Sequence, residues 1–339
     1  MLKENALIAY LINLNMQERP VTILTGFLGA GKTTFLNALI EVRKNQRFAI
    51  IENEFGEAGI DSELILRAEG DIVEMNNGCL CCTLNENLYE ILNQLFHKEE
   101  TFDELIIEAT GIADPAGIAL PFLNQPAIGK AFPLTRVICL VDAELIEDQL
   151  KENESCIQQI SFSDIILINK TDRVNPRYVQ ELVKVLAKIN PCAKVFAGNK
   201  DKFPLEAILS VEPHKSIGSS YTPNHGHGKK NNHQYTHHHH HHNHGDITSI
   251  TFKFKEQFDF DRLYARLFAF LIFQAKDVYR IKGIIKCGDG EGMIIQSVGK
   301  NISTKKHPSS KECLESRIVF IGKGLEEKAY ENMLRSCIA

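Results

Sequence analysis

The chain has 339 residues, of which 44% are hydrophobic and 24% charged, and this usage excludes a largely disordered protein. Its length is enough for two domains with a core in each. The formal net charge of -5 and the pI near 6.2 argue against a nucleic-acid partner, because phosphate binding needs a dominant basic surface.

The N-terminal segment contains a short apolar stretch, ALIAYLINL, which is interrupted by Asn13 and followed by no small-residue cleavage site. We therefore expect residues 1–19 to form an extension without a targeting role. The longest later apolar run, Leu267 to Phe273, is far shorter than the roughly 20 residues that span a bilayer. These observations predict a cytoplasmic protein with no membrane partner.

Short runs of Val, Ile and Leu alternate with helical patterns between residues 20 and 210. In chain order the runs are VTILTG, FAIIEN, DIVEM, DELIIEAT, TRVICLVD and DIILINK. Strands that alternate with helices indicate a mostly parallel sheet covered by helices on both faces. The sequence therefore predicts an α/β domain over residues 20–210.

The composition changes abruptly at residues 211–246, where ten of the 13 histidines lie between His225 and His244. The segment has no apolar periodicity, so we expect a linker, which either captures metal ions through its imidazoles or is merely solvated. Residues 247–339 resume apolar patterns. ITSITFKFKE, DVYRIKGIIKC, GMIIQSV and SRIVFIGK indicate strands, and FDFDRLYARLFAFLIFQ and residues 326–333 indicate helices. These elements predict a smaller C-terminal α+β domain.

The segment GFLGAGKTT follows the first predicted strand and fits the pattern G-x-x-x-x-G-K-[ST] of a phosphate-binding P-loop. Glycines let the backbone fold around phosphates, Lys32 supplies a full positive charge, and the Thr33 hydroxyl is placed to bind Mg²⁺. The residues expected to contact nucleotide here are Gly26, Gly29, Ala30, Gly31, Lys32, Thr33 and Thr34. An ordinary Gly-rich turn would not need the Lys-Thr pair at this offset.

A magnesium ion beside phosphates also needs an acidic residue at the end of a neighbouring buried strand. The run ELIIEATG places Glu108 there, with Gly111 three residues later. We therefore expect Glu108 to be the second magnesium ligand, either directly or through water. Together with Lys32 and Thr33, it completes the predicted catalytic set.

The segment NKTD, residues 169–172, follows the predicted strand DIILI. The Asp172 carboxylate can accept two hydrogen bonds from the ring N–H and amino group of guanine, whereas adenine offers no such pair. Asn169 and Lys170 would hold this loop and flank the base. The sequence therefore predicts GTP as the nucleotide.

These residues resemble the CobW-like GTPases, a metallochaperone group within the P-loop NTPases. The resemblance rests on Glu108-Ala109-Thr110-Gly111, where most GTPases carry Asp, and on a Cys-x-Cys-Cys motif. It also rests on ENEFGE, YRIKGII and SRIVFIGK, and it spans the chain from about residue 20 to the end. The chain departs from the family in having no Trp at all. The resemblance implies a GTPase that handles zinc or a similar divalent metal.

The Cys-x-Cys-Cys motif consists of Cys79, Cys81 and Cys82 on a turn preceded by glycine. Three thiolates can converge on Zn²⁺, and they leave the fourth position open, as suits a transferable metal. Buried structural cysteines and a redox sensor are the alternatives. Glu52 and Glu57 lie between the P-loop and the motif, where they either help to bind metal or Mg²⁺ or are solvated loop acids.

The leading hypothesis is a GTP-hydrolysing metallochaperone that binds GTP, Mg²⁺ and Zn²⁺ and loads a client metalloprotein. One alternative is an activator of one specific metalloenzyme or of a cobalt or cobalamin pathway protein. Another is a non-catalytic metal buffer or sensor in which nucleotide serves only as a folding ligand.

Overall fold

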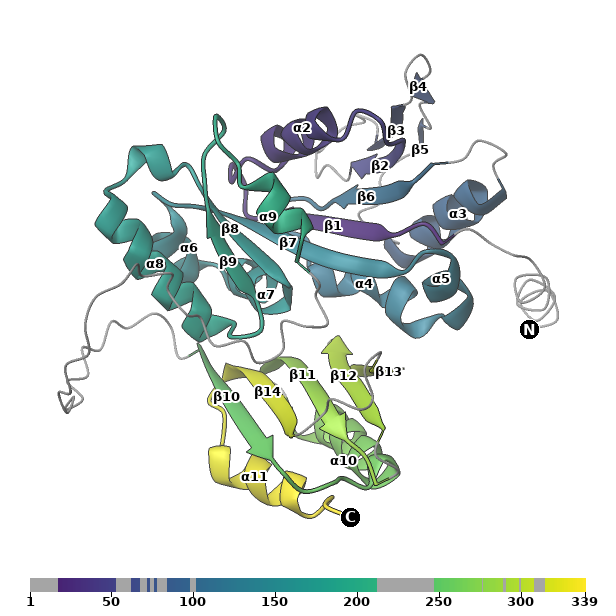
Figure 1. Cartoon of the computed structure of the whole chain (residues 1–339), viewed down its shortest axis with the longest axis vertical. Helices are drawn as coiled ribbons and strands as arrows, with labels where there is room; N and C mark the ends of the chain where they lie inside the picture. Colours follow the sequence, from purple (N-terminus) through teal and green to yellow (C-terminus); the bar gives the residue numbers. More distant parts are fainter. Residues whose placement is uncertain are drawn as a thin grey trace.

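A computed structural model describes residues 18–52, 62–67, 72–73, 76–77, 84–97, 102–211, 247–275, 277–288, 291–298, 300–307 and 315–339. These residues form two sheets, each with its own helices (Figure 1). The predicted N-terminal extension, the His-rich linker and the Cys-x-Cys-Cys motif lie outside the described residues. None of the described helices is long and apolar enough to cross a bilayer.

The N-terminal sheet has the strand order β4-β3-β2-β6-β1-β7-β8-β9, with β5 paired to β3. Its strands are β1 (Val21–Gly26), β2 (Phe48–Glu52), β3 (Ser62–Arg67), β4 (Ile72–Val73), β5 (Asn76–Asn77), β6 (Glu104–Glu108), β7 (Leu134–Asp142), β8 (Ile165–Asn169) and β9 (Lys194–Ala197). Along the part of the sheet ordered β2-β6-β1-β7-β8-β9, every neighbouring pair of strands is parallel. Strand β3 pairs antiparallel with β2. The predicted mostly parallel sheet is confirmed.

Helices cover both faces of this sheet. They are α2 (Lys32–Val42), α3 (Leu84–His97), α4 (Pro115–Asn124), α5 (Pro126–Ala131), α6 (Ile146–Glu152), α7 (Glu154–Phe162), α8 (Pro176–Ile189) and α9 (Leu205–Leu209). Side chains of a strand alternate between the two faces. Ile165 and Leu167 of β8 pack in the cluster that contains α2 and α9. Ile166 and Ile168 pack with α6, α7 and α8 on the opposite face.

The C-terminal domain is an antiparallel sheet in the order β10-β14-β11-β12-β13. Its elements are β10 (Ile247–Phe254), α10 (Phe260–Phe273), β11 (Val278–Lys286), β12 (Gly292–Val298), β13 (Asn301–Lys306), β14 (Ser316–Lys323) and α11 (Glu327–Arg335). Both helices pack in one apolar cluster with the sheet. The α+β prediction is correct, but the sequence did not indicate β13, because NISTKK is a largely exposed edge strand without apolar alternation.

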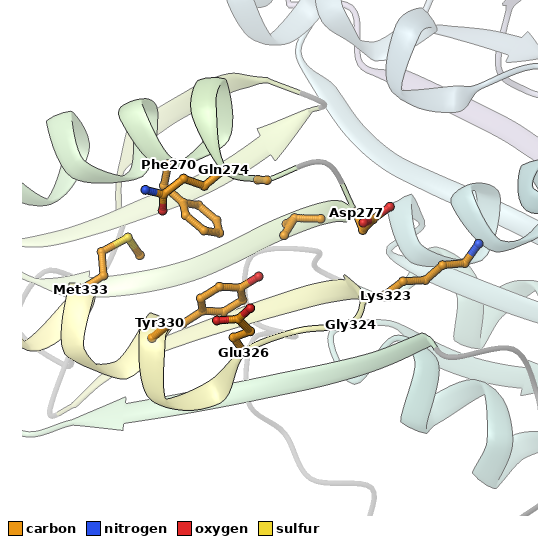
Figure 2. Close-up of a pocket in the computed structure, with 11 residues that line it drawn as sticks. Phe270, Gln274, Asp277, Lys323, Gly324, Glu326, Tyr330 and Met333 are labelled. Atoms are coloured by element: carbon orange, nitrogen blue, oxygen red, sulfur yellow. The ribbon is translucent and has the colours of Figure 1, made fainter.

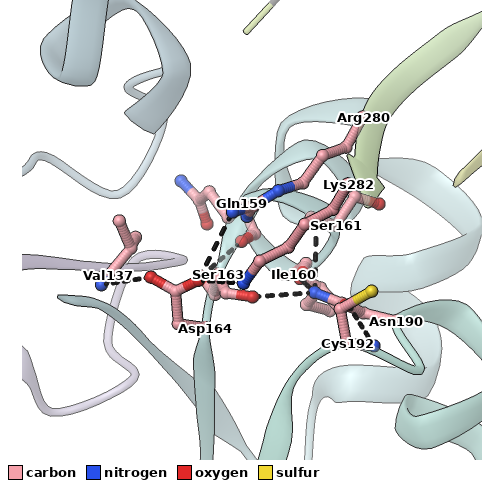
Figure 3. Close-up of polar contacts among 10 residues, drawn as sticks. All are labelled: Val137, Gln159, Ile160, Ser161, Ser163, Asp164, Asn190, Cys192, Arg280 and Lys282. Atoms are coloured by element: carbon pink, nitrogen blue, oxygen red, sulfur yellow. Dashed lines mark hydrogen bonds and ion pairs between the residues drawn. The ribbon is translucent and has the colours of Figure 1, made fainter. Parts of the chain in front are cut away.

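A buried charge cluster joins the two domains at Asp164, the residue before β8 (Figure 3). Its carboxylate accepts hydrogen bonds from Lys282 Nζ at 2.9 Å and Arg280 Nη2 at 3.3 Å, both on β11. Its second oxygen accepts from the Val137 backbone N–H at 3.0 Å. The Arg280 guanidinium also lies 4.6 Å from the Phe162 ring centre. These contacts fix the C-terminal sheet against α7 and the N-terminal sheet.

The charges in this cluster set the ionisation of Asp164. Burial alone would raise the pKa of its carboxyl, but the positive charges of Lys282 and Arg280 outweigh that effect and lower the pKa. An apolar contact adjoins the cluster, where Cys192 packs against Val319 and Ile321 of β14. The junction therefore combines a paired carboxylate with a small dry interface.

Candidate functional site

The P-loop runs from the end of β1 to the start of α2, and its shape requires glycine at three positions. Gly26, Gly29 and Gly31 have φ values of 139°, 75° and 95°, which side chains rarely adopt. A Cβ on Gly26 would stand 2.3 Å from the Leu140 carbonyl oxygen, and one on Gly31 would stand 2.4 Å from Asn169 Nδ2. The loop is therefore pressed against the ends of β7 and β8.

The N-terminus of α2 follows this loop directly. Gly31 is its N-cap and supplies no side chain to cap the first N–H groups. These donors and the positive end of the helix dipole favour an anion at this position. Ala30 and Thr34 flank the same turn. The local backbone therefore fits the phosphates of a nucleotide.

Lys32 begins α2 and folds back over the loop. Its Nζ donates to the Gly26 carbonyl at 3.0 Å and to the Phe27 carbonyl at 3.5 Å. Burial lowers the pKa of Lys32, while the negative charge of Glu108 opposes that shift. The side chain is thus held at the mouth of the loop, where its ammonium can exchange carbonyl partners for phosphate oxygens.

Thr33 and Glu108 meet although they are 75 residues apart in sequence. The Thr33 hydroxyl donates to Glu108 Oε1 at 2.9 Å. Parallel pairing of β1 with β6 places Glu108 beside Leu24, just before the P-loop. A hydroxyl and a carboxylate are oxygen ligands of the kind that Mg²⁺ prefers. The donor set therefore fits the magnesium site expected from the sequence.

Gly111 lies in the loop that follows β6 and contacts both the P-loop and α7. A Cβ at Gly111 would stand 2.5 Å from the Leu28 backbone nitrogen. Its carbonyl accepts a hydrogen bond of 3.1 Å from Gln159 Nε2, and the Ala113 carbonyl accepts one of 3.2 Å from the same nitrogen. Gln159 is fully buried in α7. Gln159 was not predicted from the sequence, where it is one of two adjacent glutamines among the apolar residues of ESCIQQISF.

The NKTD loop begins at Asn169, the last residue of β8. Asn169 Nδ2 donates to the Ala30 carbonyl at 2.8 Å, so the two nucleotide loops are bonded to each other. Lys170 adopts the left-handed conformation, with φ of 58°, and its Nζ is 2.6 Å from Asp142 Oδ2. Asp142 is buried at the end of β7. Asp142 was not among the residues predicted from the sequence, although an acid that closes the apolar strand TRVICLVD is a usable sign.

Asp172 lies in a short 3₁₀ turn, Thr171–Arg173, and its side chain is exposed. The turn is fixed by Thr171, whose backbone N–H and hydroxyl both donate to the Gly198 carbonyl, at 3.3 Å and 3.0 Å. Arg173 extends outward to Glu144 at 3.0 Å. The Asp172 carboxylate is therefore accessible from solvent, and its contact with a guanine base stays a prediction.

The predicted metal ligands lie mostly beyond the described residues. Cys79, Cys81, Cys82 and Glu57 are outside them, so their role stays a prediction. Glu52 ends β2, and its backbone is in register with that of Glu108 on the adjacent strand. In the described part of the chain, no group of three or more His, Cys, Asp or Glu side chains could hold a metal ion.

Three features together define a P-loop GTPase. They are the glycine-rich phosphate loop after β1, the acidic end of β6 in contact with the threonine of that loop, and the N-K-x-D loop after β8. Residues 20–197 match the CobW/HypB/UreG nucleotide-binding domain, and residues 247–338 match the cobalamin synthesis protein cobW C-terminal domain. The chain therefore belongs to the CobW/HypB/UreG family. The resemblance noted from its motifs is confirmed.

Relatives with curated names cover nearly the whole chain. The zinc chaperone CobW of Pseudomonas aeruginosa is 30% identical over 363 residues, covering 96% of this chain and 92% of the relative. The zinc chaperone YjiA of Escherichia coli is 31% identical over 322 residues, covering 92% and 96%. A crystal structure of the Zn(II)-bound YjiA GTPase superposes with a TM-score of 0.68 at 29% identity, covering 96% of this chain and 100% of that one.

Proposed function

We propose that this protein is a cytoplasmic GTP-hydrolysing metallochaperone that binds zinc at Cys79, Cys81 and Cys82 and delivers it to a client metalloprotein. The names of the two zinc chaperones support the metal. A third relative, the zinc-regulated GTPase metalloprotein activator 1 of Schizosaccharomyces pombe, is 32% identical over 212 residues and supports a protein client. The cysteines that the structure describes are all free thiols, in keeping with a reducing compartment.

The observation that carries the proposal is the contact between Thr33 and Glu108. It joins the P-loop to the end of β6 at 2.9 Å. We propose that these two residues hold Mg²⁺, which neutralises charge on the β- and γ-phosphates during transfer. Lys32 and the N–H groups at the start of α2 bind the phosphates, and Asp172 accepts the ring N–H and amino group of guanine. Phosphoryl transfer needs this positioning and charge more than covalent chemistry.

The end of the adjacent strand β2 could connect the nucleotide site to the zinc ligands. Glu52 is in register with Glu108, and the chain continues from Glu52 toward Glu57 and the Cys-x-Cys-Cys motif. A change in the contacts of Glu108 when the γ-phosphate is lost would therefore reach the segment that precedes the cysteines. Three thiolates leave one zinc position for a client ligand to enter. This arrangement suits transfer better than permanent storage.

Competition for zinc against a chromophoric chelator tests the proposal in three states: with a non-hydrolysable GTP analogue, with GDP and without nucleotide. Coupling of about 1 to 3 kcal/mol, typical of linked sites, would shift the zinc affinity by roughly 5- to 150-fold. By reciprocity, zinc must shift the affinity for the analogue by the same factor.

Two variants locate the effect. Cys81→Ser should abolish the shift, because a serine hydroxyl is a poor zinc ligand, whereas Cys313→Ser, outside the motif, should preserve it. Identical zinc affinities in all three nucleotide states would rule out a nucleotide-driven chaperone and leave the cysteines a structural or redox role.

A further inference from the structure

A cavity of about 480 Å³ lies in the C-terminal domain, between the end of α10 and one side of α11 (Figure 2). The start of β11 and the end of β14 complete its lining. None of the residues used in the nucleotide site contributes to it. Its volume falls within the range of about 300 to 1,000 Å³ that is usual for ligand pockets. It is therefore a separate candidate site.

The inner wall of this cavity is aromatic and apolar. The rings of Phe270 and Tyr330 meet edge to face, with centroids 5.0 Å apart and planes at 75°. Val278 and Met333 extend the same wall. The Tyr330 and Met333 side chains are only partly buried. An aromatic wall of this kind can contact an aliphatic chain and, through ring faces, a cation.

The rim of the cavity is negative. Asp277 and Glu326 are both exposed lining residues, and within the described chain neither carboxylate has an ion pair or hydrogen bond. The C-terminus of α10, capped at Gln274, adds its negative dipole end. The N-terminus of α11 contributes a positive charge of about half an elementary charge, which is smaller than the negative charge of the two carboxylates. The balance favours a cationic ligand.

Lys323 also lines the cavity but does not neutralise this rim. Its Nζ is 3.7 Å from Glu154 of α7 and lies over the Tyr279 ring, 6.0 Å from the centroid. Figure 2 shows its side chain directed away from Tyr330. Burial, together with the charges of Glu326 and Asp277, raises the pKa of Tyr330, and only a backbone hydrogen bond at Glu326 opposes the shift. The phenol thus also senses the negative rim.

We propose that this cavity binds an arginine or lysine side chain in an exposed segment of a partner protein. The cationic head would lie between Asp277 and Glu326, and the aliphatic stem would pack on Tyr330 and Phe270. Phe273, which is 80% exposed and precedes the lining residue Gln274, offers apolar surface to residues that flank the cation. The identity of that partner as a zinc client rests on the proposed function.

Fluorescence anisotropy of the full chain with labelled heptapeptides tests this inference. One peptide carries arginine between two leucines, and its match carries citrulline, which has nearly the same shape without the charge. We expect the arginine peptide to bind at least tenfold more tightly and to weaken with salt. Equal binding of the two peptides, or no measurable binding of the arginine peptide up to millimolar concentration, would overturn the inference.

Paired variants place the site. Asp277→Asn combined with Glu326→Gln should weaken the arginine peptide by about 3- to 30-fold, the loss of two partly exposed charge contacts and of support for a cation at the ring. Glu327→Gln removes an acid from the same turn of α11 that does not line the cavity, so it should have no effect. Equal losses in both variants would indicate a general field effect and contradict the site.

Two further readings separate the alternatives. Agmatine, a small guanidinium, should compete far more weakly than the arginine peptide, and equal competition would assign the cavity to small cations instead. GTP turnover and nucleotide-dependent zinc affinity should be unchanged in the double variant. If the peptide binds but zinc affinity does not depend on nucleotide, the proposed zinc chaperone function is refuted and the cavity remains a binding site. If zinc affinity depends on nucleotide but the peptide does not bind, the cavity proposal is refuted and the chaperone function remains.

Discussion

The two ends of strand β8 differ in burial and in what they contact. At its start, Asp164 is sealed between the domains and holds Arg280 and Lys282. At its end, Asn169 holds the P-loop through Ala30, beside the exposed Asp172. Ile165 to Ile168 between them are completely buried. A single buried strand thus carries a contact between the domains at one end and residues predicted to contact nucleotide at the other.

Because the two ends differ in this way, removing a carboxylate should have different effects at each of them. A buried carboxylate with charged partners cannot be removed without leaving those charges unsolvated. An exposed carboxylate loses only the ligand that it would bind. We therefore expect substitutions at the domain end of β8 to change stability, and those at the nucleotide end to change binding and turnover.

Asp164→Asn should have the largest effect. It leaves two buried cations without their carboxylate, and breaking a buried ion pair from one side costs about 3 to 5 kcal/mol in the free energy of unfolding. Urea unfolding of the full chain measures the loss. Asp172→Asn, an exposed change of the same kind, is the matched control and should shift the midpoint little. Equal midpoints for the two variants would contradict the comparison.

The pH dependence of stability provides a second test of the role of Asp164. The pKa of Asp164 is lower in the folded protein than its ordinary value of 3.8. Its contribution to stability is therefore fully present above about pH 4, and it is lost as the pH falls through the lowered folded pKa. Asp164→Asn should flatten this part of the stability profile. An unchanged acid limb in the variant would assign the acid sensitivity to other carboxyls.

Lys32→Ala should affect function strongly and leave the fold intact. Removing a preorganised charge at developing phosphate charge lowers turnover by about 10²- to 10³-fold, or about 2.7 to 4 kcal/mol. Among the described residues, its ammonium donates to the carbonyls of Gly26 and Phe27. Phosphate release assays with saturating GTP measure the loss. Turnover at the unmodified rate would refute the P-loop assignment.

Asp172→Asn should weaken GTP by about 1.5 to 3 kcal/mol, the worth of a hydrogen bond to a charged group. An amide can donate to the extra ring oxygen of xanthine, so the variant should favour xanthosine triphosphate relative to GTP. Competition against a fluorescent guanine nucleotide gives both affinities. Equal affinity of the unmodified protein for ATP and GTP would contradict the role of Asp172.

Tyr279→Phe should have the smallest effect. The Tyr279 hydroxyl donates to Glu154 Oε1 at 3.0 Å across the domain junction, but this contact is exposed. Exposed contacts of this kind contribute about 0 to 1 kcal/mol. A loss as large as that of Asp164→Asn would show that the rim of the junction, and not its buried cluster, holds the domains together.

The sequence was informative where chemistry is local. The P-loop could be predicted because positive φ values at Gly26, Gly29 and Gly31 and the charge of Lys32 are encoded within nine residues. The meeting of Thr33 with Glu108 also followed, since parallel strands bring their ends to one edge of the sheet.

Contacts between distant segments were not predictable in this way. Asp164 lies 118 residues from Lys282, and nothing in DIILINK distinguishes it from a solvated acid before a strand. Gln159 resembles any helical glutamine until its contact with Gly111, 48 residues away, is known. Polarity at β13 likewise concealed an edge strand whose pairing depends on β12.

The cysteines of the structured core have a practical consequence. Cys139, Cys156, Cys192, Cys287 and Cys337 are buried. Burial raises the pKa of the Cys156 thiol to about 12, and it also raises the pKa values of Cys139, Cys192 and Cys337. Since the thiolate is the reactive form, these side chains should resist alkylation at neutral pH. Rapid labelling of the native protein should therefore spare these five cysteines, so they need not be replaced before the other thiols are footprinted.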